Sequence, residues 1–180
     1  MAILKKVLLH ICCAPCTIYP LKQLRNEHMY VHGFFYNPNI HPYTEHVRRL
    51  KTLEEYAKVS LLPLTMNNSY ELEDFLKGAL AYGKNRCIFC YRTRLEKAFQ
   101  EAVEIDADAV TTTLLYSKYQ RHEDIRTICE EFSKQYGIDF IYRDFRTGWR
   151  EGIEESINLN MYRQNYCGCI LSEKERFKKN

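Results

Sequence analysis

Residues 7–16 read VLLHICCAPC, the most informative structural pattern in the chain. The apolar run at residues 7–11 predicts a strand that is buried on both faces, as strands of parallel sheets are. Cys12, Cys13 and Cys16 follow it directly, and the sequence from Pro15 onward predicts a helix over residues 15–27. The stretch therefore predicts a strand–turn–helix unit with three thiols in its turn.

The same alternation continues along the rest of the chain. Short β-branched or aromatic runs predict strands at residues 31–36, 61–66, 109–115 and 140–142. Segments with helical periodicity predict helices at residues 43–59, 70–80, 90–104 and 123–136. Strands that alternate with helices indicate βαβ units, so we expect an α/β protein with a mainly parallel, Rossmann-like sheet flanked by helices. No internal repeat or linker divides the chain, and we expect one domain over residues 1–180.

Composition limits the class of protein further. Hydrophobic residues make up 46% of the 180, enough to bury a core without disulfides, and the net charge of +3 permits a nucleic-acid partner without establishing one. Residues 1–11 do not match a secretory signal, and no run approaches the roughly 18 apolar residues of a membrane span. We therefore expect a cytoplasmic protein with no membrane partner, whose eight cysteines serve metal or redox chemistry.

Reactive and polar residues follow the carboxyl ends of the predicted strands. Besides the three cysteines, they are residues 37–43 (NPNIHPY) after the second strand, Tyr116, Ser117 and Gln120 after the fourth, and Asp144 and Arg146 after the fifth. Parallel sheets bind ligands beyond these ends, so we expect the loops to form one site. Cys87 and Cys90 lie at the start of a predicted helix, and they join this site if the N-terminus of that helix faces the same crevice.

Two cysteine groups have the spacing of metal ligands. Cys87 and Cys90 form a CxxC pair at a helix start, where the helix dipole favours thiolates. Together with Cys12 and Cys13, these thiolates suit either a [4Fe–4S] cluster or a tetrahedral zinc ion. The spacing alone does not choose between them, although an adjacent cysteine pair is unusual for zinc and favours iron–sulfur.

The third group, Cys167-Gly168-Cys169, permits different chemistry. The pair either relays two electrons as a strained disulfide or supplies ligands to a second metal, and the sequence does not separate these roles. Cys16 is likewise a fifth ligand, a resolving thiol or a neighbour of the helix start. Cys129 stands alone in a helical segment and is interpreted as a small buried residue.

Five separated motifs carry a resemblance to a known family. LLHICCAPC, FFYNPNIHPYTEHVRRL, RCIFCYRTRLEKA, AVTTTLLYSKYQ and MYRQNYCGCILS together resemble the QueH-type epoxyqueuosine reductases over nearly the whole chain. The resemblance implies the last step of queuosine synthesis: removal of the epoxide oxygen from epoxyqueuosine at the wobble position of tRNA. It also implies iron–sulfur chemistry without cobalamin, and a fold like those of adenine-nucleotide hydrolases and ATP pyrophosphatases.

Nucleotide binding is not expected in spite of that fold. The resembling nucleotide-binding proteins carry a Gly- and Ser-rich loop after the first strand, whereas this chain has the cysteine-rich turn there. The chain also lacks GxGxxG and GxxxxGK[ST], so we expect no nucleotide cofactor.

The implied reaction needs two electrons and two protons, whereas a [4Fe–4S] cluster passes electrons singly. Our hypothesis is that Cys12, Cys13, Cys87 and Cys90 hold the cluster, which delivers electrons and acts as Lewis acid on the epoxide oxygen. Cys167 and Cys169, or an additional iron, would complete the electron count, and the electron donor is unidentified. Candidate proton donors are His10, Tyr116, Asp144 and Tyr162.

The tRNA partner needs stacking surfaces and phosphate contacts around the redox centre, because single bases are read in unpaired loops. The candidate substrate-binding residues are Tyr36, Asn37, Tyr43, Arg48, Tyr91, Ser117, Gln120 and Arg163, with further candidates at Tyr116, Tyr119, Tyr162, Tyr166, Arg49, Arg86, Arg92, Arg94 and Arg121. Two alternatives stay open: a zinc-stabilised RNA-binding module and a thiol–disulfide oxidoreductase.

Overall fold

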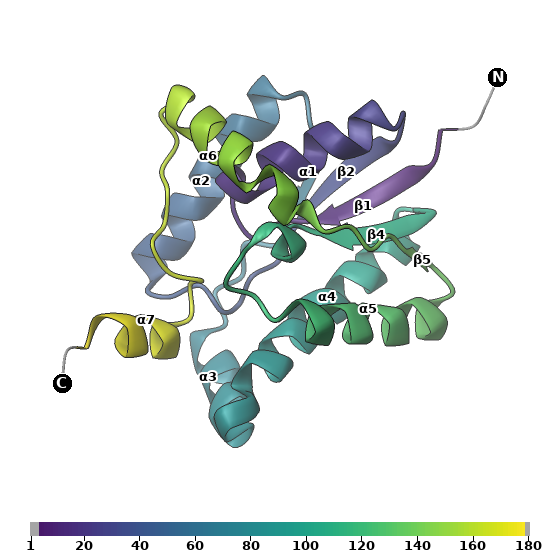
Figure 1. Cartoon of the computed structure of the whole chain (residues 1–180). Coiled ribbons are helices and arrows are strands. Elements are labelled where there is room, and N and C mark those ends of the chain that lie inside the picture. The colour runs from purple at the N-terminus through teal and green to yellow at the C-terminus, as the bar shows by residue number, and fades with distance from the viewer. Residues whose placement is uncertain (1–3, 179–180) are drawn as a thin grey trace.

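A five-stranded parallel sheet forms the centre of the computed structural model, which describes residues 4–178 (Figure 1). The strand order is β3-β2-β1-β4-β5, and every neighbouring pair is parallel. The strands are β1 (Lys6–His10), β2 (Tyr30–Phe35), β3 (Leu64–Met66), β4 (Ala109–Thr112) and β5 (Asp139–Phe140). The predicted α/β class with a parallel, Rossmann-like sheet is confirmed.

Helices cover both faces of this sheet. The helices are α1 (Ala14–Asn26), α2 (Tyr43–Val59), α3 (Leu72–Ala81), α4 (Arg86–Glu104), α5 (His122–Tyr136), α6 (Trp149–Asn158) and α7 (Ile170–Phe177), of which α3 packs on α4. In Figure 1, α1, α2 and α6 lie on one side of the sheet, and α4 and α5 lie on the other. Three short 3₁₀ turns join these elements: η1 (Gly83–Asn85), η2 (Thr113–Tyr116) and η3 (Phe145–Gly148).

The central strand β1 divides its side chains between two cores. Val7 and Leu9 pack with residues of α1 and α2, whereas Leu8 packs with residues of α4 and α5. All three are fully buried, as expected for a strand with helices on both faces. The sequence VLLHI therefore fixes β1 at the middle of the sheet, and the cysteines that follow it lie at the sheet's carboxyl edge.

Three predicted strands are too long. The segment predicted at 61–66 pairs only from Leu64, because Leu61 has a positive φ of 50° and Pro63 cannot donate to a ladder. The segment predicted at 109–115 ends at Thr112, whose hydroxyl accepts a hydrogen bond from the Leu114 N–H and starts η2. The segment predicted at 140–142 is reduced to β5.

The predicted helices agree with the structure more closely, but α4 begins earlier than the predicted residue 90. Its first turn is held by Phe89, which packs against Phe75 of α3 with ring centroids 5.6 Å apart. Both Cys87 and Cys90 therefore lie at the start of the helix. Helices α6 and α7 were not predicted.

The reversal of strand order positions the site. The chain adds β2 and β3 on one side of β1 and β4 and β5 on the other, which leaves a crevice at the carboxyl ends of β1 and β4. No helix within residues 4–178 is long and apolar enough to cross a bilayer.

Candidate active site

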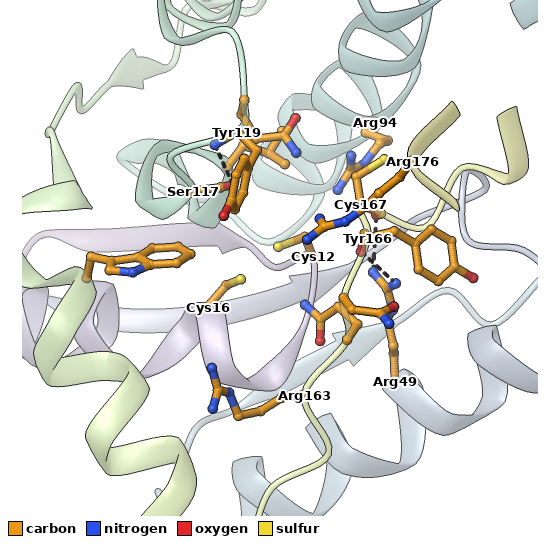
Figure 2. A pocket seen from close by; sticks show the side chains of 15 residues that line it. Cys12, Cys16, Arg49, Arg94, Ser117, Tyr119, Arg163, Tyr166, Cys167 and Arg176 are labelled. Atoms are coloured by element: carbon orange, nitrogen blue, oxygen red, sulfur yellow. Dashed lines mark hydrogen bonds between the residues drawn. The ribbon is translucent and has the colours of Figure 1, made fainter. Parts of the chain in front are cut away.

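A cavity of about 290 Å³ lies at the carboxyl ends of β1 and β4 (Figure 2). In this view Cys12 and Cys16 lie between Ser117 and Tyr119 on one side and Arg163 on the other. The lining residues are Cys12, Cys16, Arg49, Arg94, Leu114, Ser117, Tyr119, Gln120, Trp149, Arg163, Gln164, Asn165, Tyr166, Cys167 and Arg176. The cavity thus combines thiols, aromatic rings and arginines.

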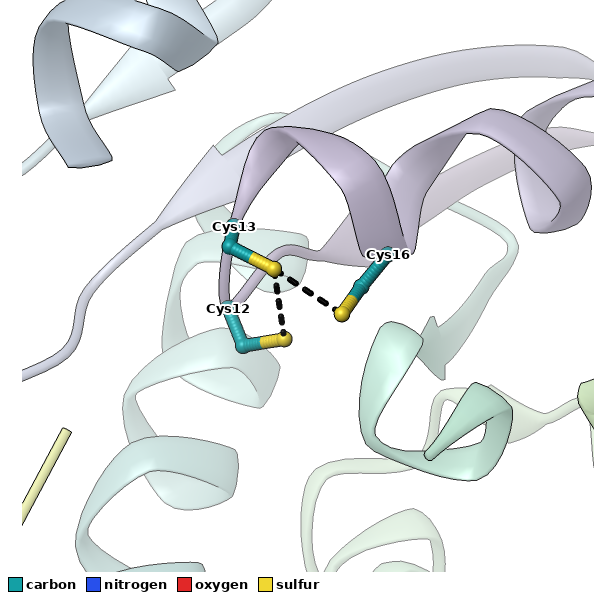
Figure 3. Close-up of side chains that lie close together, drawn as sticks. All are labelled: Cys12, Cys13 and Cys16. Atoms are coloured by element: carbon teal, nitrogen blue, oxygen red, sulfur yellow. Dashed lines mark hydrogen bonds between the residues drawn. The ribbon is translucent and has the colours of Figure 1, made fainter. Parts of the chain in front are cut away.

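Cys12, Cys13 and Cys16 form a compact triad of thiols, which we call the cysteine triad (Figure 3). The sulfur of Cys13 lies 3.8 Å from that of Cys12 and 2.9 Å from that of Cys16, and all three lie within 4.8 Å of one another. Sulfurs bound to one tetrahedral ion at about 2.3 Å are themselves about 3.8 Å apart. The Cys12–Cys13 distance matches this spacing, and a small separation of the closer Cys13 and Cys16 sulfurs would let all three bind one metal ion.

The end of β1 and the start of α1 place these thiols. Cys13 is the N-cap of α1 in an extended conformation, and a proline in the first helical turn begins the helix, so that Cys16 lies one turn further on. The Cys12 N–H donates to the Thr113 hydroxyl of η2 at 3.0 Å, and that hydroxyl donates to the Cys12 sulfur at 3.2 Å. The triad is therefore tied to the end of the neighbouring strand.

Hydrogen bonding within the triad favours one thiolate. The pKa of Cys12 lies well below its ordinary value, because the Cys13 and Cys16 thiols donate hydrogen bonds toward it and Arg94 is nearby. Burial raises the pKa of Cys13 to about 12, and this side chain is only 1% exposed. Gln164 also donates from Nε2 to the Cys13 sulfur at 2.6 Å. The arrangement supplies a soft, partly anionic donor set.

The other four clustered cysteines, Cys87, Cys90, Cys167 and Cys169, line a second, smaller cavity of about 30 Å³, and we call them the cysteine quartet. The first two come from the start of α4, and the last two from the loop that precedes α7. Gly168 turns that loop with a φ of +117°, and its carbonyl accepts a hydrogen bond from the His41 N–H at 2.8 Å. Cys167 lines both cavities, so the two cysteine groups are neighbours.

Arg94 also lines both cavities and is only 2% exposed. It donates from Nη2 to the Asn37 side-chain oxygen at 2.6 Å and from Nη1 to the Cys90 sulfur at 3.7 Å. Within residues 4–178, no carboxylate pairs with it, although a buried guanidinium normally needs an anion. The thiol groups around it are the groups that can carry that charge.

Arg49, also 2% exposed, fixes the loop that carries Cys167. Its Nε pairs with Glu45 at 2.6 Å, and its two terminal nitrogens donate to the carbonyls of Tyr166 and Cys167, each at 3.1 Å. Tyr162 donates from its hydroxyl to the second oxygen of Glu45 at 2.6 Å. One ion pair on α2 therefore positions the segment that closes one side of the cavity.

The four candidate proton donors lie outside the cavity lining. His10 is fully buried between Thr112 and the Tyr36 carbonyl, and burial lowers its pKa to about 3, so it is neutral. Asp144 pairs with Arg146 on the surface, which lowers its pKa. The hydroxyls of Tyr116 and Tyr162 donate to the Trp149 carbonyl and to Glu45, respectively, and burial raises the pKa of both.

The predicted substrate-binding residues fall into three groups. Ser117, Gln120 and Arg163 line the cavity. Behind them, Tyr91 donates to Gln120 at 2.8 Å, Asn37 holds Arg94, and Tyr36 donates to Glu71 at 3.0 Å. Tyr43 and Arg48 lie on the exposed face of α2, where Arg48 stacks on Tyr162 at 3.7 Å.

Sequence reasoning missed Leu114, Trp149, Gln164, Asn165 and Arg176, which also line the cavity. Trp149 is the only tryptophan of the chain, which was an available signal. Gln164 and Asn165 lie between the singled-out Arg163 and Cys167 in YRQNYC, whereas nothing in the sequence around Arg176 points to the site.

A parallel Rossmann-like sheet with grouped thiols at its switch point defines a class of α/β proteins that carry metal or redox chemistry where others bind nucleotides. The family model described as epoxyqueuosine reductase QueH matches residues 7–175. The chain belongs to the QueH family and is therefore an oxidoreductase.

Two curated relatives match over nearly their whole length. Epoxyqueuosine reductase QueH of Dehalococcoides mccartyi is 34% identical over 174 residues, covering 97% of this chain and 96% of the relative. QueH of Thermotoga maritima is 34% identical over 183 residues, with coverages of 96% and 93%.

A solved structure described as a predicted subunit of tRNA methyltransferase from Methanocaldococcus jannaschii has a similar fold. Its TM-score is 0.58 at 13% identity, and the match covers 86% of this chain and 75% of that one. At this identity the likeness supports the fold alone.

Proposed function

We propose that residues 1–180 form one domain that reduces epoxyqueuosine to queuosine at the wobble position of tRNA, in the cytoplasm, with an iron–sulfur cofactor. Membership of the QueH family supports the reaction. The main structural support for this site is the cavity in which Cys12 and Cys16 face arginines and aromatic rings. A redox centre and an RNA-binding surface thereby share one space.

The donor set fits a metal cofactor. Three thiols lie within 4.8 Å of one another, they are soft ligands, and buried Arg94 lies next to them as a counter-charge. Cys12 and Cys13 at the end of β1, with Cys87 and Cys90 from α4, would hold a [4Fe–4S] cluster. When bound, such a cluster supplies single electrons and a Lewis-acidic iron for the epoxide oxygen.

The electron count assigns a role to the remaining thiols. The epoxide accepts two electrons and two protons, its two carbon–oxygen bonds break, and an alkene and water are formed. Oxidation of Cys167 and Cys169 from dithiol to disulfide releases two electrons and two protons, which balances the reaction. The alternative is an additional iron held by Cys16, Cys167 and Cys169. An external donor of electrons must then restore the reduced state.

None of the four candidate proton donors lines the cavity, so the proton donor would act from its edge. Tyr116 is the best placed, because its hydroxyl contacts the backbone of Trp149, which lines the cavity. Tyr162 is joined to Arg49 through Glu45, while His10 and Asp144 are committed to structural hydrogen bonds. Tyr116 and Tyr162 are therefore the proposed sources of protons, which water would relay to the substrate.

The test is metal and sulfide analysis of protein purified without oxygen, followed by incubation with epoxyqueuosine-containing tRNA and a strong reductant. About four irons, about four sulfides and conversion to queuosine are expected. More iron than this would indicate the additional site. One zinc ion without conversion would replace the proposal with a zinc-stabilised RNA-binding module, and metal-free protein that turns over dithiols would replace it with a thiol–disulfide oxidoreductase.

A further inference from the structure

Trp149, the only tryptophan of the chain, lies at the first position of α6 and lines the same cavity as Cys12 and Cys16. It is half-buried, and the proposed chemistry assigns no role to its ring. An aromatic ring on the wall of a reaction cavity offers a flat apolar surface of the kind on which nucleobases stack.

Neighbouring residues hold this ring firmly. Tyr116 stacks on Trp149 with ring centroids 5.4 Å apart and an interplanar angle of 28°. The Tyr116 hydroxyl also donates to the Trp149 carbonyl at 3.0 Å. Gly152, one turn into α6, allows this approach, because a Cβ there would overlap the tyrosine hydroxyl. The ring is therefore pre-organised, which lowers the entropy lost when a ligand binds.

A second aromatic ring and two cations surround it. Tyr119, which is 74% exposed and also lines the cavity, meets the Trp149 ring edge-on at 6.1 Å. Lys118 lies 5.2 Å over the Trp149 ring, and Arg176 lies 5.8 Å over the Tyr119 ring. Flat apolar surface with adjacent cations is the composition of a surface that stacks a base and contacts its phosphates.

We propose that Trp149 and Tyr119 form the platform that holds the modified wobble base while its reacting ring lies against the cysteine triad. Because their rings stand at 78° to each other, one ring stacks on the base and the other contacts its edge. The proposal rests on the proposed function and adds the residues that select and orient the substrate. Enzymes that act on a base in an unpaired loop hold it against aromatic side chains, and within the lining of this cavity Trp149, Tyr119 and Tyr166 are the aromatic rings. Tyr166 is less suited, because buried Arg49, which Glu45 holds in place, already lies 5.2 Å over its ring.

The first test uses the fluorescence of the holoenzyme, since emission from its only tryptophan reports from the platform. An RNA stem-loop that carries epoxyqueuosine is compared with the same stem-loop lacking a base at the wobble position. We expect the first to quench Trp149 emission, and the second to bind, as followed by anisotropy, without quenching. Equal quenching by both, or binding of the modified stem-loop without quenching, would overturn the platform.

The second test separates stacking from folding. Trp149→Ala should raise KM about tenfold to hundredfold, the loss expected when one stacked base loses its aromatic partner, while kcat falls much less. Trp149→Phe should restore most of the affinity. A matched control is Tyr142→Ala, because Arg126 lies 5.0 Å over that ring in the same kind of contact, but outside the cavity lining.

The outcomes distinguish the two proposals. If wild-type enzyme binds the stem-loop but does not convert it, the proposed function fails, whatever the tryptophan does. If the wild type converts it and Trp149→Ala, with unchanged metal content and circular dichroism, keeps the wild-type KM, the platform is wrong and the function stands. Should Trp149→Ala not fold, the fluorescence test on the wild type still decides.

Discussion

The cysteine triad and the cysteine quartet are neighbours, but they are built in different ways. The triad comes from one short segment, the turn between the central strand β1 and α1, and Thr113 ties it to the end of β4. The quartet joins the start of α4 to a loop far along the chain, which buried Arg49 holds by its carbonyls. The sheet therefore fixes the triad, whereas the quartet depends on a loop.

The largest effect is expected from removing the central thiol of the triad. Cys13→Ser should lose bound metal and lower turnover by at least about a hundredfold, because Cys13 contacts both other thiols and is completely enclosed. Metal analysis and a tRNA conversion assay measure this. Cys129→Ser, at the lone buried cysteine of α5, is the control and should keep both properties. Full metal and activity in Cys13→Ser would remove the triad from the site.

The quartet should respond differently to the loss of its exposed thiol. Cys167→Ser is expected to stop multiple turnover while the metal at the triad stays bound, because Cys167 comes from the loop and not from the sheet. Iron content measured beside turnover decides its role. Unchanged iron indicates a redox pair, and loss of part of the iron indicates the additional metal. Normal turnover would exclude Cys167 from both roles.

A smaller effect is expected from replacing Arg94, which lines the cavities of both cysteine groups. Arg94→Gln should weaken metal binding by about tenfold to a hundredfold, because it removes the buried cation beside Cys90 and near Cys12. Competition with a chelator measures the affinity. Arg92→Gln is a matched control on the same helix, since Arg92 is more exposed and pairs with Glu131. If both variants bind metal alike, Arg94 has only a structural role.

The position of the triad was predictable from the sequence because local order determines it. The apolar run at residues 7–11 favours a strand buried on both faces, and such a strand places Cys12 and Cys13 at the carboxyl edge of the sheet, where the structure has them. The helix predicted at residues 43–59 matches α2 at both ends, because its apolar positions repeat over many turns. Spacing of three residues at a helix start also accounts for Cys16 beside Cys13.

The quartet and the rest of the cavity wall were less predictable because they depend on contacts between distant segments. Helix α6 has 10 residues and buries only Gly152 and Ser156, and α7 has 8 residues and buries none among those described, so their apolar side chains are too few to mark a helix clearly in the sequence. Trp149 reaches the cavity through its stack on Tyr116. Which end-of-strand side chain faces a cavity also depends on packing, as His10 shows by turning into the core.

Two buried histidines, His10 beside the triad and His41 beside the loop of the quartet, affect how stability depends on pH. Burial lowers the pKa of His10 to about 3, below its ordinary value of 6.5, and it lowers the pKa of His41 as well. Between pH 6.5 and 3 the unfolded chain therefore binds a proton at residue 10 that the folded chain does not, so stability falls as pH falls. One such group contributes at most about 1.4 kcal/mol per pH unit.

His10→Asn should flatten the pH dependence of the unfolding free energy, measured by denaturant titration, more than His41→Asn does. If His10→Asn and the wild type have equal slopes of unfolding free energy against pH, His10 does not control acid stability. A larger change in His41→Asn would assign that control to His41, beside the loop that carries Cys167 and Cys169.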